Sequence, residues 1–134
     1  MRLAMALLTF SGLASAQPGA PNKPRVRREP PTVSIASLVV TGPLEKDIVR
    51  RYLRRNNNKF TYCYEKHLLV DDKLKGTLKA AYEITADGTV ANAGTMGVEG
   101  EAAACTKKVL ERIEYPRPKG DKSVAVKVDF VLRR

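Results

Sequence analysis

Two cysteines set the strongest constraint on how this 134-residue chain can fold. Cys63 lies in KFTYCYEKHLL and Cys105 lies in ACTKKVLERI, and both segments have the apolar spacing of an amphipathic helix. Two cysteines in an exported chain form a disulfide by default, because the compartment is oxidising. If the chain is exported, we therefore expect a Cys63–Cys105 bond between two helices.

The first sixteen residues have the three parts of a secretory signal peptide. Arg2 supplies a positive charge, an apolar run extends from Leu3 to Leu13, and Ala14 and Ala16 form an A-x-A cleavage pattern. The pattern predicts cleavage before Gln17 and a periplasmic or secreted protein of the bacterial envelope; an uncleaved amphipathic N-terminus is the alternative. The apolar run is shorter than the roughly 20 residues of a membrane span, and we expect no transmembrane segment after cleavage.

Residues 17–33, QPGAPNKPRVRREPPTV, are rich in proline and basic side chains and carry little apolar surface. This composition predicts a disordered or polyproline-like linker. Its cluster of Arg25, Arg27 and Arg28 suits an anionic surface, while a soluble spacer is the simpler interpretation.

The positive charge of the chain favours anionic partners. The formal net charge is +10, and it falls to +9 without the signal peptide, which holds one basic residue and no acid. In the envelope such partners are anionic lipid headgroups, cell-wall polymers or acidic protein surfaces. Export excludes nucleic acid as a partner.

Residues 34–134 have the pattern of one small domain. A short strand is expected around Ile35–Val40, before Gly42-Pro43, and a helix from about residue 44 to 69. A bend in this helix is expected at residues 56–58, because these are three asparagines and asparagine is a weak helix former. Residues 76–98 are typical of a hairpin. Its turn is expected at Asp87-Gly88, because both residue types tolerate positive φ.

A second helix is expected over residues 101–113, before Tyr115-Pro116, and a final strand over residues 123–132. This order predicts an α+β fold, a small antiparallel sheet with two helices packed on one face. The disulfide would staple the two helices. Forty-one residues lie between the cysteines, and loop-closure entropy gives a stabilisation of about 4 kcal/mol for that length.

Several short motifs follow one another from Gly42 onward. They are Cys63-Tyr64-Glu65 followed by Leu68, Gly76 before a strand, Asp87-Gly88-Thr89-Val90, Cys105, and Tyr115-Pro116 before the last strand. In this order and spacing the chain resembles the AgmX/PglI C-terminal domain family, which is similar to the C-terminal domain of the energy transducer TonB. The resemblance implies a TonB-like fold and a non-enzymatic periplasmic or surface module. Tyr115 departs from the phenylalanine that is common in the family.

The sequence offers little for catalysis or metal binding. His67 is the only histidine, and it cannot pair with Cys63 as a nucleophile if that cysteine is oxidised. One histidine and two distant cysteines do not make a zinc site. We expect no enzyme, no cofactor and no metal, with a hydrolytic enzyme as a distant alternative.

Four arginines of the first helix form a candidate site for an anion or partner. Arg50, Arg51, Arg54 and Arg55 make two i, i+4 like-charge pairs, whose repulsion of a few tenths of a kcal/mol each an anion would relieve. A solvated helix face is the simpler interpretation.

The last strand is a second candidate site. If Val124, Val126, Val128 and Phe130 lie in an edge strand, its free backbone groups can accept an extended peptide, as TonB-like domains do; an internal strand is the alternative. The leading hypothesis is a protein-interaction module that binds an envelope protein through a sheet edge or the basic helix. The alternative is binding of peptidoglycan or another anionic glycan through the arginines.

Overall fold

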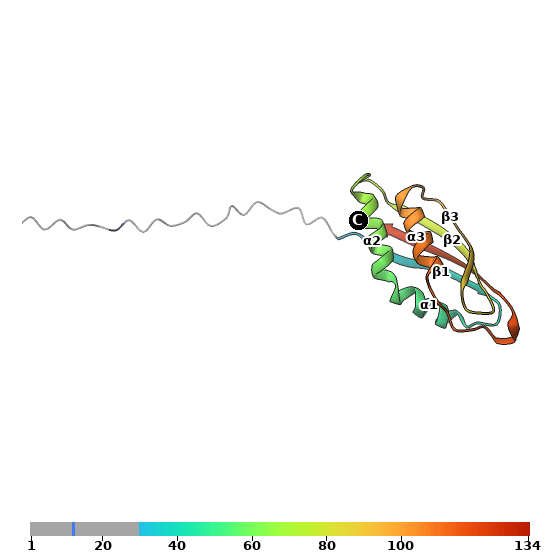
Figure 1. Cartoon of the computed structure of the whole chain (residues 1–134). Helices are drawn as coiled ribbons and strands as arrows, with labels where there is room; N and C mark the ends of the chain where they lie inside the picture. The colour runs from blue at the N-terminus through green and yellow to red at the C-terminus, as the bar shows by residue number, and fades with distance from the viewer. Residues whose placement is uncertain (1–11, 13–29) are drawn as a thin grey trace, which may run out of the picture.

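The computed structural model describes residue 12 and residues 30–134 (Figure 1). The expected signal peptide, residues 1–16, lies outside the described residues except for residue 12, and the expected linker, residues 17–33, is described only from residue 30. The elements follow in the order β1 (Thr32–Thr41), α1 (Lys46–Arg55), α2 (Asn57–Leu68), β2 (Gly76–Ile84), β3 (Val90–Met96), α3 (Glu101–Glu111), the 3-10 turn η1 (Lys119–Asp121) and β4 (Val124–Arg133).

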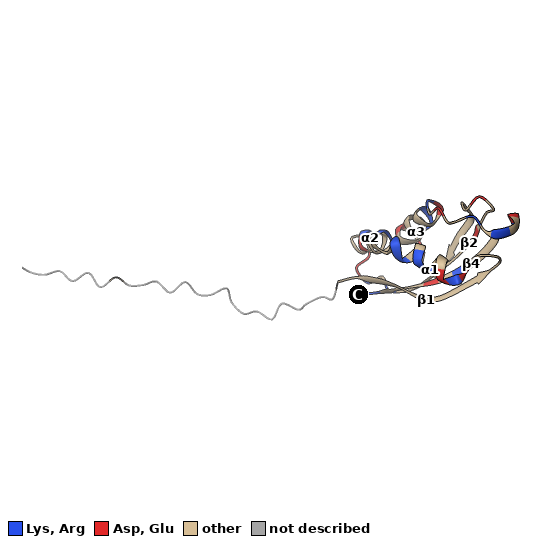
Figure 2. Ribbon diagram, turned by 90° about the horizontal axis from the view of Figure 1, so that it is seen from below, with Lys and Arg blue, Asp and Glu red and all other residues tan. Residues whose placement is uncertain are grey.

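The strands form one four-stranded antiparallel sheet, and the helices cover one of its faces (Figure 2). The strand order is β1-β4-β2-β3. The expected α+β fold is confirmed. β1 begins at Thr32, two residues before the expected start of the domain, and it already buries Val33.

β4, the candidate edge strand, is an internal strand, so the alternative holds and the candidate edge site at its Val124, Val126, Val128 and Phe130 is ruled out. Val126 pairs with Val40 of β1 on one side and with Tyr82 of β2 on the other, and Val128 is likewise flanked by both strands. An apolar inward row is compatible with either position, because the helix layer covers that face whether a strand has one neighbour or two. The buried row is Val124, Val126, Val128, Phe130 and Leu132. The edges of the sheet are β1 and β3.

The core lies between the sheet and the helices. Alternate residues of β2, from Leu78 to Ile84, are buried on the same face as the inward row of β4. Phe60 of α2 packs against Phe130 in a tilted arrangement, with ring centroids 4.8 Å apart. Since strand side chains alternate between faces, the intervening residues of these strands lie on the opposite, helix-free face of the sheet.

The expected single helix over residues 44–69 is two helices that meet at Asn56. The side-chain amide of Asn56 donates a hydrogen bond of 2.8 Å to the carbonyl oxygen of Tyr52, and its φ and ψ of −98° and 6° leave the helical range. Asparagine competes in this way for backbone carbonyls that a helix would use. The bend that the asparagines predicted is therefore present, and it separates α1 from α2.

The β2–β3 turn packs against the segment that follows α3. Gly88 has a φ of +87°, and its N–H donates to the carbonyl oxygen of Thr85 at 2.9 Å, whereas Asp87 has no positive φ. The N–H of Tyr115 donates to the carbonyl oxygen of Gly88 at 2.8 Å. A Cβ on Gly88 would lie 2.1 Å from the Tyr115 carbonyl oxygen, so only glycine permits this approach.

Tyr115 also joins the connection before β4 to the sheet. Its hydroxyl forms a buried hydrogen bond of 2.7 Å with the hydroxyl of Tyr82. Burial raises the pKa of Tyr115 to about 12. The pKa of Tyr82 is raised as well, mainly by burial and to a smaller extent by the neighbouring Tyr115. Both hydroxyls are therefore held in the neutral form. Phenylalanine at residue 115 would fill the same space but would leave the Tyr82 hydroxyl without its partner.

Candidate binding surfaces

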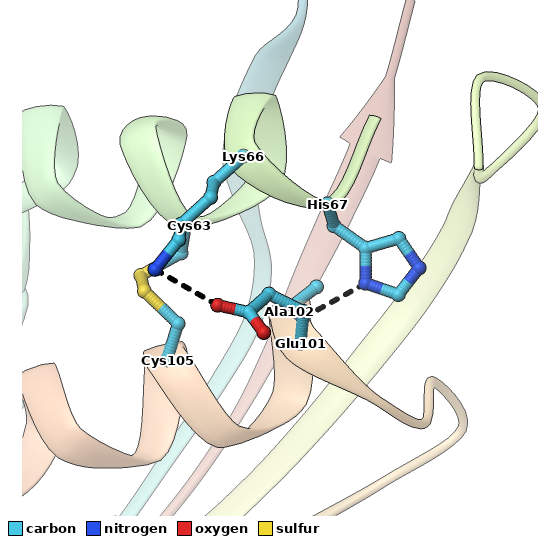
Figure 3. Close-up of a disulfide and its surroundings, with 6 residues drawn as sticks. All are labelled: Cys63, Lys66, His67, Glu101, Ala102 and Cys105. Carbon is cyan, nitrogen blue, oxygen red and sulfur yellow. Dashed lines mark hydrogen bonds and ion pairs between the residues drawn. A yellow bond between two sulfur atoms is a disulfide. The ribbon is translucent and has the colours of Figure 1, made fainter. Parts of the chain in front are cut away.

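The expected disulfide joins α2 to α3. Cys63 and Cys105 are bonded, with their Cα atoms 5.5 Å apart (Figure 3). Cys63 is buried and Cys105 is half-buried. Because both sulfur atoms are in this bond, the described chain holds no free thiol for nucleophilic chemistry.

His67 caps the start of α3 rather than taking part in a catalytic pair. Its Nδ1 accepts a hydrogen bond of 2.9 Å from the backbone N–H of Ala102 (Figure 3). The residue before α3, Gly100, has no side chain with which to cap the helix. The first N–H groups of a helix need an acceptor from elsewhere, and His67 supplies one from α2. This role accounts for the only histidine of the chain.

An ion pair forms the third link between the two helices. Lys66 Nζ lies 2.9 Å from Glu101 Oε1, and both side chains are about half exposed (Figure 3). The hydrogen bond with Glu101 raises the pKa of Lys66, and the same bond lowers the pKa of Glu101. The contribution of Glu101 to stability is present above the pKa of an unfolded glutamate and is lost as the pH falls through its lowered folded value. The pair is exposed, so it is a weak link beside the disulfide.

A basic groove runs between α2 and α3 on the outer side of the helix layer. It encloses about 480 Å³ and is lined by the disulfide, by Tyr62 and Val109, and by four basic side chains, which are Lys59, Lys66, Lys108 and Arg112. Tyr62 is exposed over 61% of its surface. The only acid in the lining is Glu101, which is already paired with Lys66. This surface adds to the positive charge of the adjoining helix α1.

The four arginines of the candidate anion site gather on α1, as expected. Arg50, Arg51, Arg54 and Arg55 line one shallow hollow together with Asp47. Arg50 Nη1 lies 3.5 Å from Asp47 Oδ1, and the guanidinium of Arg55 lies 5.0 Å from the centre of the Tyr52 ring. Within the described part of the chain Arg51 and Arg54 form no ion pair. One acid against four arginines leaves a surface suited to an anion.

The two edge strands differ in how well they resist pairing with another strand. β3 has seven residues and a bulge at Asn92, whose φ is +53°. β1 has ten residues, TVSIASLVVT, with neither charge nor proline. Charges, proline, bulges and short length are the devices that protect a sheet edge. Each edge strand has one bulge, at Ala36 in β1, and neither has a charge or a proline, so the greater length of β1 is what separates them. β1 is the less protected edge.

The helix-free face of the sheet adds apolar surface next to β1. Val39 of β1 and Met96 of β3 are exposed over 53% and 67% of their surfaces and line a shallow hollow with small side chains such as Ala81 and Gly94. Lys127 of β4 lies between Val39 and Ala81 in the cross-strand register. This hollow reaches the β1 edge at Val39.

Neither a metal site nor a membrane-spanning helix is found in residues 30–134. No group of three or more histidine, cysteine, aspartate and glutamate side chains there could hold a metal ion. No helix in that range is long and apolar enough to cross a membrane. Every buried side-chain nitrogen and oxygen in the same range has a hydrogen-bond partner, so no unpaired polar group marks a hidden site.

Sequence reasoning missed β1 as an edge and His67 as a helix cap. Residues 30–44 form the longest uncharged stretch of the described chain, but this does not mark an edge, because edge strands are commonly protected by charge. No signal for the second exists in the sequence, since the pairing of His67 with Ala102 depends on how α2 and α3 pack. No family model matches the chain, and no curated protein or solved structure matches it either.

Proposed function

We propose that this chain is a non-enzymatic, exported binding module of the bacterial envelope that recognises a protein partner by strand addition at β1. The observation that carries the proposal is the free β1 edge, which is ten residues long and uncharged in a chain with a net charge of +10. The resemblance to the AgmX/PglI C-terminal domain family, and through it to TonB-like domains, supports the same class of function. The signal-peptide pattern and the disulfide support the exported location.

The register of β1 indicates where a partner strand would pair. The bulge at Ala36 divides the strand, and residues 37–41 then pair with β4 without a further shift. A regular segment of five residues presents an uninterrupted row of outward N–H and C=O groups to an extended peptide. The partner strand would therefore lie along residues 37–41, with its side chains near the exposed Val39.

Two matched variants test the edge. Val39→Glu places a charge on the edge strand, and Ala81→Glu places the same charge on the internal strand β2. Both residues are exposed, both are on the helix-free face, and both neighbour Lys127 in the register. The two variants thus differ mainly in whether the new charge lies at the edge.

The assay is pull-down from an envelope extract with the tagged chain, followed by identification of the captured protein and measurement of its affinity for each variant. Strand addition at β1 predicts at least a tenfold loss of affinity for Val39→Glu and little change for Ala81→Glu. It also predicts binding that survives added salt, because salt does not screen backbone hydrogen bonds as it screens surface charges. Equal loss for both variants would move the partner to the helix-free face. Full binding by Val39→Glu would refute the edge.

A second candidate function is binding of an anionic glycan such as peptidoglycan through α1. The specific observation is the hollow lined by four arginines and one acid, in which Arg51 and Arg54 form no ion pair in the described part of the chain. Sedimentation with purified peptidoglycan tests this function, with the double variant Arg51→Ala/Arg54→Ala and the control Lys127→Ala on the opposite face. Glycan binding predicts steep weakening by salt and loss in the double variant alone.

A further inference from the structure

The turn after α2 exposes the two most accessible large apolar side chains of the described residues. Leu69 is 88% exposed and Val70 is 84% exposed. Single exposed apolar residues are common on protein surfaces, but two adjacent aliphatic side chains that make almost no contact with their own domain need another explanation. They project from the molecule rather than lining a groove.

Hydrogen bonds hold this turn in place, so the exposure does not come from a frayed helix end. The N–H groups of Val70 and Asp71 donate to the carbonyl oxygen of His67 at 3.0 and 2.9 Å. The hydroxyl of Tyr64 donates to the carbonyl oxygen of Leu74. Arg134 Nη1 donates to the carbonyl oxygen of Asp72 at 3.0 Å, which ties the turn to the end of β4.

Exposed basic residues follow the two aliphatic residues in the turn and end β4, which is tied to the turn by Arg134. We define the α2 tip as residues 69–75 with Arg133 and Arg134. Its exposed basic residues are Lys73, Lys75, Arg133 and Arg134, against two acids, Asp71 and Asp72. One of those acids is engaged within the turn, because Asp71 Oδ1 accepts the backbone N–H of Lys73 at 3.1 Å.

The N-terminal segment of the chain joins the domain at the same end. Thr32, the first residue of β1, pairs with Arg133, and Figure 1 shows the C-terminus beside the start of β1 and the end of α2. The preceding residues in the sequence include Lys23, Arg25, Arg27 and Arg28.

We propose that the α2 tip docks on the surface of an anionic lipid bilayer. Leu69 and Val70 enter the boundary between headgroups and acyl chains, and the basic residues of the tip lie against lipid phosphates. Interfacial binding of this kind combines buried apolar area with attraction to anionic lipid. A bilayer is favoured over a protein partner because the apolar pair protrudes, and a soft interface can admit a protruding pair without a matching pocket. This site goes beyond the β1 edge and does not depend on it.

A tryptophan substitution reports insertion directly, because the chain contains no tryptophan. Leu69→Trp is expected to give a blue-shifted emission with vesicles of phosphatidylcholine and phosphatidylglycerol, and no shift with phosphatidylcholine alone. Val39→Trp, at an exposed valine on the sheet, is the control and should not shift with either. The protein is taken after export, with its N-terminus established by mass, because an uncleaved signal peptide would itself bind lipid.

The double variant Leu69→Ser/Val70→Ser measures the apolar contribution. Both residues are exposed, so the variant should fold, and its affinity for the mixed vesicles is expected to fall by at least about tenfold, while Val39→Ser binds as the unaltered chain does. Equal binding by the double variant would overturn the proposal, because the basic residues alone would then suffice. Absence of vesicle binding by the unaltered chain would also overturn it. Loss of protein capture by the double variant in that case would identify the tip as a protein-docking surface instead.

Discussion

Replacing Gly88 by alanine should destabilise the domain more than its place in a hairpin turn suggests. Gly88 has a φ of +87°, and a Cβ there would lie 2.1 Å from the carbonyl oxygen of Tyr115. The obstructing atom belongs to the backbone, so it cannot rotate away as a side chain would. Relieving the contact moves the turn from Tyr115 and breaks the 2.8 Å hydrogen bond from the Tyr115 N–H to the Gly88 carbonyl oxygen.

The expected loss is about 2–3 kcal/mol in the free energy of unfolding. A residue other than glycine in the left-handed region costs about 1–2 kcal/mol, and the lost hydrogen bond costs about 1 kcal/mol. A domain of this size has a total stability of about 5–15 kcal/mol, so the variant should remain folded but be weakened clearly. Gly120→Ala is the matched control, because Gly120 has a φ of +77° and nothing within 4 Å of the added Cβ.

Urea unfolding monitored by circular dichroism measures both variants. With a slope of about 1–2 kcal/mol per molar urea, the midpoint of Gly88→Ala should fall by roughly 2 M and that of Gly120→Ala by about half as much or less. The slope itself should not change. A Gly88→Ala midpoint equal to that of Gly120→Ala would refute the close approach of the β2–β3 turn to Tyr115.

Other contacts give equally direct tests. The double variant Cys63→Ala/Cys105→Ala should lose about 4 kcal/mol in urea unfolding on the loop-entropy estimate, and a reductant should affect only the unaltered chain. Tyr115→Phe should lower the free energy of unfolding by about 1–3 kcal/mol, because it leaves the buried Tyr82 hydroxyl unpaired. The double variant Tyr82→Phe/Tyr115→Phe should lose less than the sum of the two single variants, and additive losses would contradict the hydrogen bond. Because the pKa of Tyr115 is raised to about 12, its contribution to stability is complete below about pH 10, where unfolded tyrosine begins to ionise, and it is lost between about pH 10 and 12. In that window the unaltered chain should therefore lose stability more steeply than the double phenylalanine variant. His67→Ala should cost about 1 kcal/mol by removing the cap of α3, whereas Glu65→Ala on the exposed side of α2 should be nearly neutral; equal effects would contradict the cap.

Local patterns predicted most of the fold. The alternation from Leu78 to Ile84 and from Val124 to Leu132 reflects burial of one strand face, and it is visible in the sequence because the strand period is two residues. The bend at Asn56 was predicted because asparagine is a weak helix former. The disulfide was predicted because the only two cysteines of an exported chain are expected to bond with each other in an oxidising compartment.

Strand order could not be predicted in the same way. The inward row of β4 is buried whether β4 has one neighbour or two, so its periodicity does not distinguish an edge from an internal strand. The lack of charge in β1 does not mark it as an edge, because edge strands are commonly protected by charged side chains. The four arginines of α1 were correctly grouped, since i, i+4 spacing alone places them on one side of a helix.

Intact-mass spectrometry of the protein purified from its native envelope fraction, with and without a reductant, is the most direct test of an exported and oxidised binding module. We expect a chain that begins at Gln17 and that gains the mass of two hydrogens on reduction of the Cys63–Cys105 bond. Free thiols on a chain that keeps Met1 would contradict export. The uncharged β1 edge would then have to be explained in a reducing compartment, and the arginines of α1 would have to be tested against nucleic acid.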